Sequence, residues 1–287
     1  SQKRSKQSSK TKHIGDCSMK AQTFSLTGAK QDEIELPKVF STPVNPTLIH
    51  RAYVNLDSHH YQRQGRMPSA GQNTVAASND PPTGHGQARV ARIRGGGPRR
   101  GQGAKVAMTR GGRQAHPPTS EKVVYKKLNK QENRLALCSA IAATASKDLV
   151  TARGHLTQGI ESFPVVVSDD IESISKAKDI SKVFQALKLS QDITRLESRK
   201  ARSGRSVIRG RKTKVGKSVL FVTKDAKSLS KACGAFPGVD VRTVKDLSVL
   251  DLAPGSNLVR LTVYSKSAIG EISNIKSRHL ELMEALQ

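Results

Sequence analysis

The most constraining feature of this sequence is a stretch from Pro81 to Ser120 that contains no acidic residue. It contains nine glycines, including the run Gly95–Gly97. A segment with so few apolar side chains cannot bury a core of its own, so the fold must be built elsewhere in the chain. The basic residues of the stretch are Arg89, Arg92, Arg94, Arg99, Arg100, Lys105, Arg110 and Arg113.

A second acid-free segment lies between Glu197 and Asp225. Over the whole chain, 49 Lys and Arg stand against 23 Asp and Glu, a formal charge of +26. A compact protein with this charge repels itself unless a polyanion neutralises it, and nucleic acid is the polyanion that the excess predicts. The basic residues of the second segment are Arg199, Lys200, Arg202, Arg205, Arg209, Arg211, Lys212, Lys214 and Lys217.

The residues around the first stretch indicate how it would contact nucleic acid. No Phe, Tyr or Trp occurs between Gln62 and Val124, so the aromatic platforms on which single-stranded bases stack are absent. Arginine pairs bidentately with phosphate, and glycine lets the backbone approach a surface closely. We therefore predict a loop that threads through folded RNA and becomes ordered on binding.

Other function classes have little support in the sequence. No apolar run approaches the roughly 18 to 20 residues that span a membrane, so no membrane partner is expected. The three cysteines form no CxxC pair, and the histidines lack metal-ligand spacing, so we expect no metal and no cofactor. Residues 1–18 are predicted to form a basic N-terminal tail.

Four β-branched or apolar runs alternate with helical patterns in the second half of the chain. This order predicts an α/β fold, namely a three-layer α/β/α domain with a mainly parallel four-stranded sheet, plus the long extended basic loop. The expected strands are Pro164–Ser168, Ser218–Thr223, Val239–Val241 and Leu258–Tyr264.

Several helices and a strand pair are also expected. Asn129 and Glu132 have capping-box spacing, and apolar residues recur as far as Leu149, which predicts one amphipathic helix. Further helical patterns run from Ile180 to Leu187 and from Ile269 to Leu286. Near the N-terminus we expect a strand pair, 22–26 with 33–36, and a helix from Asn45 to about Tyr61.

Two motifs have some of the features of enzyme sites. Gly210–Ser218 is similar to a phosphate-binding P-loop, but it has one residue too many between its glycines and precedes its strand, so we reject it. Asp169 and Asp170 follow a predicted parallel strand, where paired carboxylates bind magnesium or else favour the N-terminus of the next helix. An RNA-processing enzyme using these two residues is therefore an alternative hypothesis. A chromatin-like DNA binder is another.

Long stretches of the chain resemble the universal large-subunit ribosomal protein four family, in its archaeal and eukaryotic branch. The glycine-rich block is the most specific of them, and AHPP within it is typical of archaea. The matching stretches are ELPKVFSTPV (35–44), GHGQARVARIRGGGPRRGQGAKVAMTRGGRQAHPP (84–118), LNKQENRLALCSAIAATASKDLV (128–150), PVVVSDD (164–170), SVLFVT (218–223) and LAPGSNLVRLTVY (252–264).

The resemblance implies a structural, non-enzymatic constituent of the large subunit of cytoplasmic ribosomes. It implies that the two basic segments bind large-subunit rRNA and that the loop tip forms part of the constriction of the nascent-peptide exit tunnel, facing large-subunit protein twenty-two. The implied partners are thus rRNA, neighbouring ribosomal proteins and the nascent peptide. The residues expected at the tip are His85, Gly86, Arg94, Gly95, Gly96, Gly97 and Arg99.

The sequence departs from the family at three places. His85 occupies a position where the family usually has arginine, so we expect the local charge there to depend on pH. Pro81 and Pro82 replace a common aromatic residue and glycine, and residues 1–18 precede the family's usual start at Met19. The expected domains are the tail (1–18), the first part of the globular domain (19–61), the RNA-binding loop (62–127) and the α/β globular domain (128–287).

Overall fold

The computed structural model describes residues 19–78, 86, 88–197, 200–275 and 277–285. The chain divides into two compact units, which are described separately. The larger unit comprises the residues up to Asp57 and those from Lys127 onward, and the smaller unit is Ser58–Lys126. None of the helices in the described ranges has the length and apolar character needed to span a bilayer.

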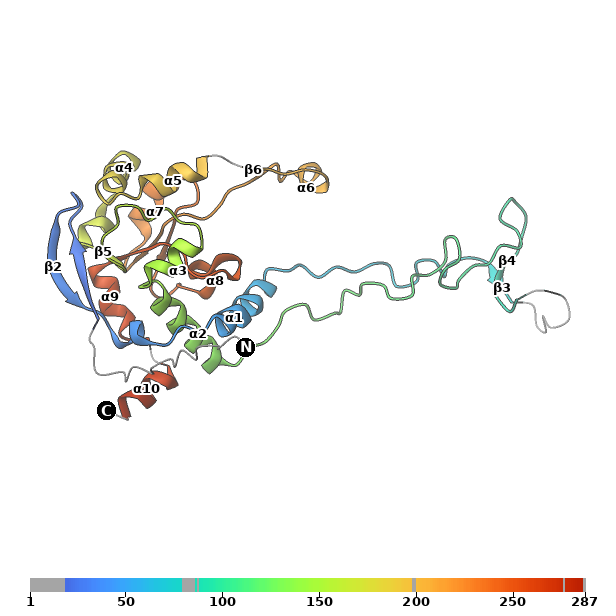
Figure 1. Ribbon diagram of the computed structural model, residues 1–287. Helices are drawn as coiled ribbons and strands as arrows, with labels where there is room; N and C mark the ends of the chain where they lie inside the picture. The colour runs from blue at the N-terminus through green and yellow to red at the C-terminus, as the bar shows by residue number, and fades with distance from the viewer. Residues whose placement is uncertain (1–18, 79–85, 87, 198–199, 276, 286–287) are drawn as a thin grey trace, which may run out of the picture. The chain divides into compact units, whose positions relative to one another are not determined.

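A six-stranded sheet organises the larger unit (Figure 1). All neighbouring strands in it are parallel except β1 and β2, which are antiparallel. The α/β class and the mainly parallel sheet are thereby confirmed. In sheet order the strands are β2 (Lys30–Glu35), β1 (Lys20–Phe24), β5 (Val165–Val167), β10 (Thr262–Ser265), β8 (Leu220–Thr223) and β9 (Asp240–Thr243).

The predicted strand count of four was wrong. The expected N-terminal strand pair forms, but it also joins the sheet, because β1 pairs with β5 at Thr23 and Phe24. The fourth predicted run, Leu258–Tyr264, becomes a strand only from Thr262. Before it, the Arg260 backbone N–H donates to the Leu252 carbonyl at 2.8 Å rather than to a neighbouring strand.

Alternate strand residues face two separate cores, one on each side of the sheet. Val166, Leu220 and Tyr264 belong to one core, whereas Val165 and Phe221 belong to the other. This alternation follows from the two-residue period of a strand, and it explains why these strands are apolar on successive residues. The predicted three-layer α/β/α arrangement is therefore present.

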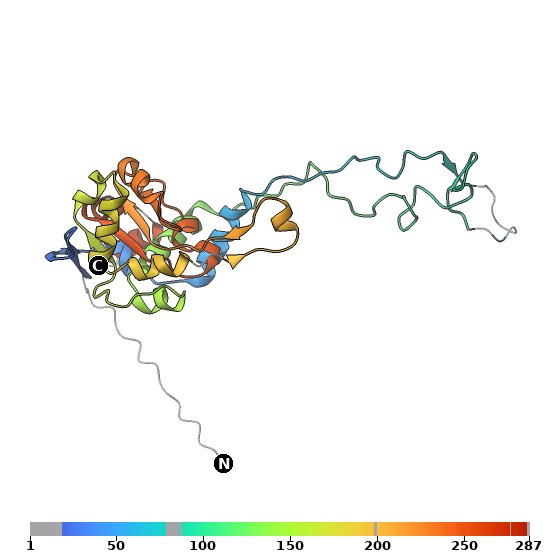
Figure 2. The same ribbon diagram turned by 90° about the horizontal axis from the view of Figure 1, so that it is seen from above.

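Helices cover both faces of the sheet (Figures 1 and 2). The first core includes residues from η1 (Lys38–Ser41), α1 (Pro46–Ser58), α2 (Lys130–Ala143), α8 (Val249–Leu252) and α9 (Lys266–Ile272). The second includes residues from α3 (Lys147–Ala152), η2 (Asp169–Ser173), α4 (Ala177–Ala186), α5 (Ser190–Glu197) and α7 (Lys227–Cys233). The remaining helical elements of this unit are α6 (Arg205–Ile208), η3 (Pro254–Ser256) and α10 (Arg278–Ala285).

The helix predicted to begin after Asn129 is divided in two. Asn129 caps α2 by accepting a hydrogen bond from the Gln131 N–H, but Glu132 forms an ion pair with Arg51 instead of completing a capping box. The interruption lies at Thr144, whose hydroxyl donates to the Ile141 carbonyl at 2.7 Å. Such side-chain bonding competes with the helical ladder, so α3 starts separately.

The predicted C-terminal helix is also two helices, α9 and α10. The N–H groups of Asn274 and Ile275 bond to carbonyls three residues back, which tightens and ends α9. Ser277 then accepts from the Leu280 N–H at 3.4 Å at the start of α10. Serine and asparagine favour such local bonds over a continuous helix, so the apolar periodicity alone overestimated its length.

Gly238 tests how tightly the chain packs where β9 begins. A Cβ at this position would lie 2.5 Å from the Gly216 carbonyl oxygen, and the backbone φ is +74°. We expect Gly238→Ala to lower the free energy of unfolding by about 3 kcal/mol, because left-handed strain adds to overpacking. The measurement is urea unfolding followed by circular dichroism.

Gly154→Ala is the matched control, because Gly154 also has a positive φ, +98°, but open space around its Cβ position. Only the conformational cost, about 1 kcal/mol, is expected there. Equal losses in the two variants would contradict the close packing at Gly238.

Candidate nucleic-acid interface

Asp169 and Asp170 follow β5, at the carboxyl edge where α/β enzymes usually place their active sites. Asp169 accepts hydrogen bonds from the N–H and hydroxyl of Ser267, at 2.7 and 2.8 Å. The nearby Glu172 accepts from the Lys224 N–H at 2.8 Å and from the Ser265 hydroxyl at 2.7 Å. These carboxylates therefore join the ends of β5, β8 and β10.

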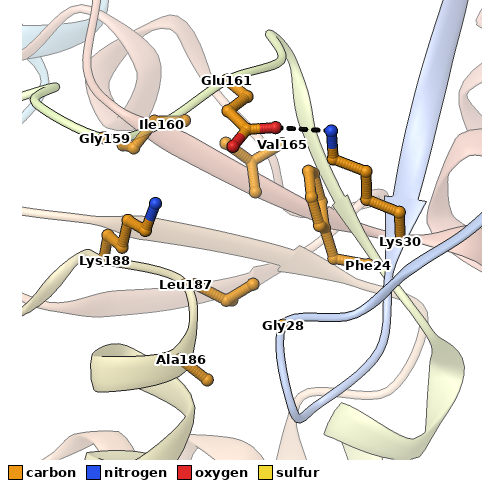
Figure 3. Close-up of a pocket in the computed structure, with 10 residues that line it drawn as sticks. All are labelled: Phe24, Gly28, Lys30, Gly159, Ile160, Glu161, Val165, Ala186, Leu187 and Lys188. Atoms are coloured by element: carbon orange, nitrogen blue, oxygen red, sulfur yellow. Dashed lines mark ion pairs between the residues drawn. The ribbon is translucent and has the colours of Figure 1, made fainter.

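Two features of the described residues bear on metal and cofactor binding. No group of three His, Cys, Asp or Glu side chains there has the arrangement of a metal site. The pocket in Figure 3 measures about 70 Å³, and the Lys30–Glu161 ion pair, 2.6 Å long, lies on its wall. Cofactor sites enclose roughly 300 to 1,000 Å³, so this pocket is too small for one.

The smaller unit begins and ends with two chain arms, one after Ser58 and one before Lys126, which run side by side (Figures 1 and 2). At one end the Ser58 hydroxyl accepts from the Lys126 N–H at 2.8 Å, and the rings of His59 and Tyr125 lie 5.7 Å apart. Further along, a Cβ on Gly65 would meet Ser120 at 2.9 Å. The arms thus contact each other through a hydrogen bond, a ring contact and a close approach of their backbones rather than through an apolar core.

Beyond the two arms, the chain forms a small framework made mostly of hydrogen bonds. Two short antiparallel strands, β3 (Ala76–Ala77) and β4 (Arg92–Ile93), pair within it. A Cβ on Gly71 would lie 2.3 Å from the Gly112 carbonyl oxygen, so only glycine allows this crossing. The framework explains how a stretch with few large apolar side chains holds a defined backbone.

Three arginines support this framework through their own side chains. Arg66 donates to the Ala70 carbonyl at 2.6 Å, Arg92 to the Gly101 carbonyl at 3.0 Å and Arg99 to the Arg110 carbonyl at 2.8 Å. Two of the residues predicted to bind RNA, Arg92 and Arg99, therefore also have a structural role. The sequence analysis did not select Arg66, which has no distinguishing motif.

The other predicted basic residues of the stretch mostly point into solvent. Arg89, Arg94, Arg100, Arg110 and Arg113 are exposed, whereas Lys105 is half-buried. The side chains of Arg100, Arg110 and Arg113 form no ion pair or hydrogen bond with another described residue. They are therefore available for an external anion.

The predicted tip residues divide between described and undescribed positions. Gly86, Arg94, Gly95, Gly96, Gly97 and Arg99 are described and exposed, while His85, Pro81 and Pro82 lie outside the described residues. Gly86, Gly95 and Gly97 have positive φ angles, which explains their identity. Gly96 does not, and apart from Gly96 and its two neighbours no atom of the described residues lies within 4 Å of its Cβ position. Nothing inside the described chain therefore requires glycine at position 96.

The second basic segment forms a hairpin in the larger unit. Strands β6 (Lys200–Ala201) and β7 (Thr213–Lys214) pair antiparallel, and α6 lies between them. Figure 2 shows this hairpin standing away from the sheet. Arg205, Arg209, Arg211 and Lys212 are exposed and Arg202 is half-buried, whereas Arg199 lies outside the described residues.

A buried ionic network anchors the end of this hairpin where the chain returns to β8. Arg260 is fully buried and donates to the carbonyls of Val219 at 3.1 Å and Gly238 at 2.7 Å. It also binds the Asp240 carboxylate at 2.6 Å, which Lys217 shares at 2.8 Å. Lys217, predicted to face phosphate, also belongs to this network.

Asp192 forms the neighbouring half of the network and is also fully buried. Its carboxylate accepts from Ser218 at 2.6 Å, from Arg195 at 3.0 Å and from His155 at 3.1 Å. Burial alone would raise the pKa of the Asp192 carboxyl, but the hydrogen bonds from His155, Arg195 and Ser218 hold that pKa well below its usual range. The carboxylate thus stays charged inside the fold.

The only sequence signal for this network was Arg260 itself, a charged residue in the middle of the apolar run LVRLTVY. A charge at such a position requires buried partners, but the sequence does not show which residues supply them. Asp192, His155 and Asp240 come from distant parts of the chain, and none belongs to a recognisable motif.

Comparison with known proteins gives a family for this arrangement. The sequence model of the ribosomal protein L4/L1 family matches residues 34–275, which include the strands β5, β8, β9 and β10 and both basic segments. The chain belongs to this family. The resemblance predicted from the sequence is therefore confirmed.

Curated relatives from archaea extend the match over nearly their whole length. The chain is similar to large ribosomal subunit protein uL4 of Methanococcus maripaludis, with 42% identity over 256 residues, 89% of this chain and 99% of the relative. It is 41% identical to uL4 of Methanococcus vannielii over 255 residues, 88% of this chain and 98% of the relative.

Membership of the L4 family makes this chain a ribosomal protein, a structural component of the translation machinery and not an enzyme. Its location is the ribosome, in the cytoplasm. The alternative hypothesis of an RNA-processing enzyme is therefore wrong, and Asp169 is left with the hydrogen bonds to Ser267 described above.

Asp192→Asn tests the network that anchors the second hairpin. Removing one charge from a buried pair leaves its partners uncompensated, so we expect the free energy of unfolding at pH 7 to fall by about 3 kcal/mol. Asp179→Asn is the control, because its ion pair with Lys182 is exposed and should contribute at most about 1 kcal/mol. Urea unfolding measures both.

The same variant tests the pKa of Asp192. Because the folded-state pKa is depressed, its stabilisation is complete above the unfolded-state value of about 4 and is lost as the pH falls through the folded-state pKa. The difference in stability between the unmodified chain and Asp192→Asn should therefore shrink as the pH is lowered below about 4. A difference independent of pH would contradict the assignment.

Proposed function

We propose that this protein is a structural constituent of the large ribosomal subunit that binds and stabilises large-subunit rRNA through its two basic segments. The observation that carries the proposal is the set of exposed arginines on both segments, with no acidic side chain between Pro81 and Ser120 to compete for them. The printed names of the relatives, large ribosomal subunit protein uL4, support the choice of subunit.

The physical basis of the binding is phosphate neutralisation. Each phosphate that an arginine neutralises releases a condensed counterion, so affinity rises and becomes strongly dependent on salt. The side chains that we propose to contact rRNA are Arg89, Arg92, Arg94, Arg99, Arg100, Lys105, Arg110, Arg113, Arg199, Lys200, Arg202, Arg205, Arg209, Arg211 and Lys212.

The glycine framework has a complementary role in this proposal. Hydrogen bonds such as that from Arg99 to the Arg110 carbonyl fix the backbone without bulky side chains. A narrow segment of this kind fits between RNA helices, where a conventional apolar core would be too wide. The internal bonds also reduce the conformational entropy that binding must remove.

We further propose that the end of the longer segment lines the nascent-peptide exit tunnel, next to large-subunit protein twenty-two. The residues involved are His85, Gly86, Arg94, Gly95, Gly96, Gly97 and Arg99. Gly96 gives this part of the proposal its support, because no contact or backbone angle inside the described chain requires glycine there. A surface outside the chain that approaches position 96 closely would require it.

A triple variant tests the rRNA contacts. Arg100→Gln, Arg110→Gln and Arg113→Gln together should weaken binding to a folded large-subunit rRNA transcript and reduce the slope of log affinity against log salt by about 2 to 3. Fluorescence anisotropy at several potassium concentrations provides the measurement. Random duplex DNA at equal salt is the second probe, and comparable affinity for it would favour the chromatin-like alternative.

The matched control removes three cations that already have acidic partners. Arg51, Lys182 and Arg242 pair with Glu132, Asp179 and Asp251, respectively. Their replacement by Gln changes the net charge by the same amount. If this control lowers the salt slope as much as the test variant, binding depends on overall charge and not on the proposed interface.

Gly96→Ala tests the proposed tip. The free chain should keep its stability within about 0.5 kcal/mol, because the added methyl group meets no atom of the described residues beyond its own neighbours. Incorporation into reconstituted large subunits, or their resistance to dissociation, should decrease. Normal incorporation and an unchanged tunnel footprint would contradict close approach at this position.

A further inference from the structure

Strand β2 is the outer strand of the six-stranded sheet and has only one neighbour among the described residues, β1 (Figure 1). The Leu36 N–H donates to the Met19 carbonyl at 2.8 Å, so the backbone of Leu36 faces β1. Because N–H and C=O groups alternate in direction along a strand, those of Glu35 and Glu33 face away from the sheet. These unpaired groups are a template for another strand.

The side chains of β2 carry a charge opposite to that of the rest of the molecule. The strand reads KQDEIE, with three acidic residues against one lysine, in a chain that has about twice as many basic as acidic residues. Lys30 is paired with Glu161. Asp32, Glu33 and Glu35 are exposed, and none of them forms an ion pair with another described residue.

We propose that this edge, defined as the outward side of Glu33–Glu35 next to the register shift in β2, binds an extended lysine- or arginine-rich polypeptide segment of another protein by strand addition. Backbone hydrogen bonds would hold the segment in register, and the acidic side chains would select its basic residues. The same acidic side chains repel RNA phosphates, so the edge is separate from the two RNA-binding segments.

Protection against aggregation is the simplest competing explanation, because charges on an edge strand discourage pairing. Lysine is the usual residue for that purpose, and this chain is rich in it, yet β2 carries mainly carboxylates. Pairing with a second copy of β2 is also disfavoured, because two strands of net negative charge repel each other. An acidic edge on a strongly basic protein therefore favours a basic partner.

The test uses the full chain and a fluorescein-labelled peptide of alternating lysine and threonine. A second peptide has the same charge but carries N-methyl groups on alternate backbone nitrogens, which removes the donors along one edge. Strand addition predicts measurable binding of the first peptide and at least tenfold weaker binding of the second. Equal binding of the two peptides would reduce the effect to charge alone and overturn the proposal.

A triple variant tests the acidic side chains. Asp32→Asn, Glu33→Gln and Glu35→Gln together should weaken binding of the first peptide about tenfold, from the cross-strand charge pairs at Glu33 and Glu35, which share one face, and from the nearby charge of Asp32. The matched control, Asp148→Asn, Glu197→Gln and Glu281→Gln, neutralises three exposed acids elsewhere. Equal weakening in the two variants would overturn the assignment to β2.

Two further measurements separate the other occupants of this edge. Light scattering of the free chain should show a monomer, and a dimer that the triple variant abolishes would assign the edge to self-association. Removal of residues 1–18 should leave peptide binding unchanged. A gain in binding after that truncation would show that the edge is covered by this chain itself, contrary to the proposal.

Discussion

The buried guanidinium group of Arg260 must be paired inside the fold, and its partners fix the arrangement of one end of the sheet. A charge without water is costly unless it is paired and hydrogen-bonded, and Arg260 binds one carboxylate and the backbone carbonyls at the starts of β8 and β9. The Asp240 carboxylate that compensates it also binds Lys217, the last cation before β8. The end of a strongly basic segment is thereby attached firmly to the core.

Charge in this protein is divided between two environments. Buried or half-buried cations such as Arg260 and Arg195 have carboxylate partners, whereas Arg100, Arg110 and Arg113 have none among the described residues. Arg92 and Arg99 are intermediate, because they support the glycine framework through backbone carbonyls. A protein with a charge of +26 can fold in this way because the unpaired charge lies on segments that stand outside the core.

The sequence predicted much of the fold because its strands carry their own signal. Val165–Val167 and Leu220–Val222 are buried on both faces, so their uninterrupted apolar character indicated parallel strands between helices. The attachment of β1 to β5 was missed, because local patterns do not specify which strands become neighbours. Helix interruptions at Thr144 and at Asn274–Ile275 depend on individual hydrogen bonds, which periodicity does not detect.

The candidate interface was predictable in its charge but not in its detail. The absence of acidic residues identified both basic segments. The sequence showed nothing of the arginines used for the framework, since the same guanidinium donors bind either carbonyl or phosphate oxygens. Lys217 illustrates the same limit, because its partner Asp240 is 23 residues away.

Cosedimentation of this chain with large ribosomal subunits after washes of increasing salt tests the proposed rRNA binding most directly. A segment that runs between RNA helices should keep the protein on the subunit at salt concentrations that remove a peripheral RNA binder. A shortened version that lacks the glycine-rich framework beyond the two arms should wash off at much lower salt. Release of the complete protein at the same low salt as that shortened version would contradict the central role of the glycine-rich segment.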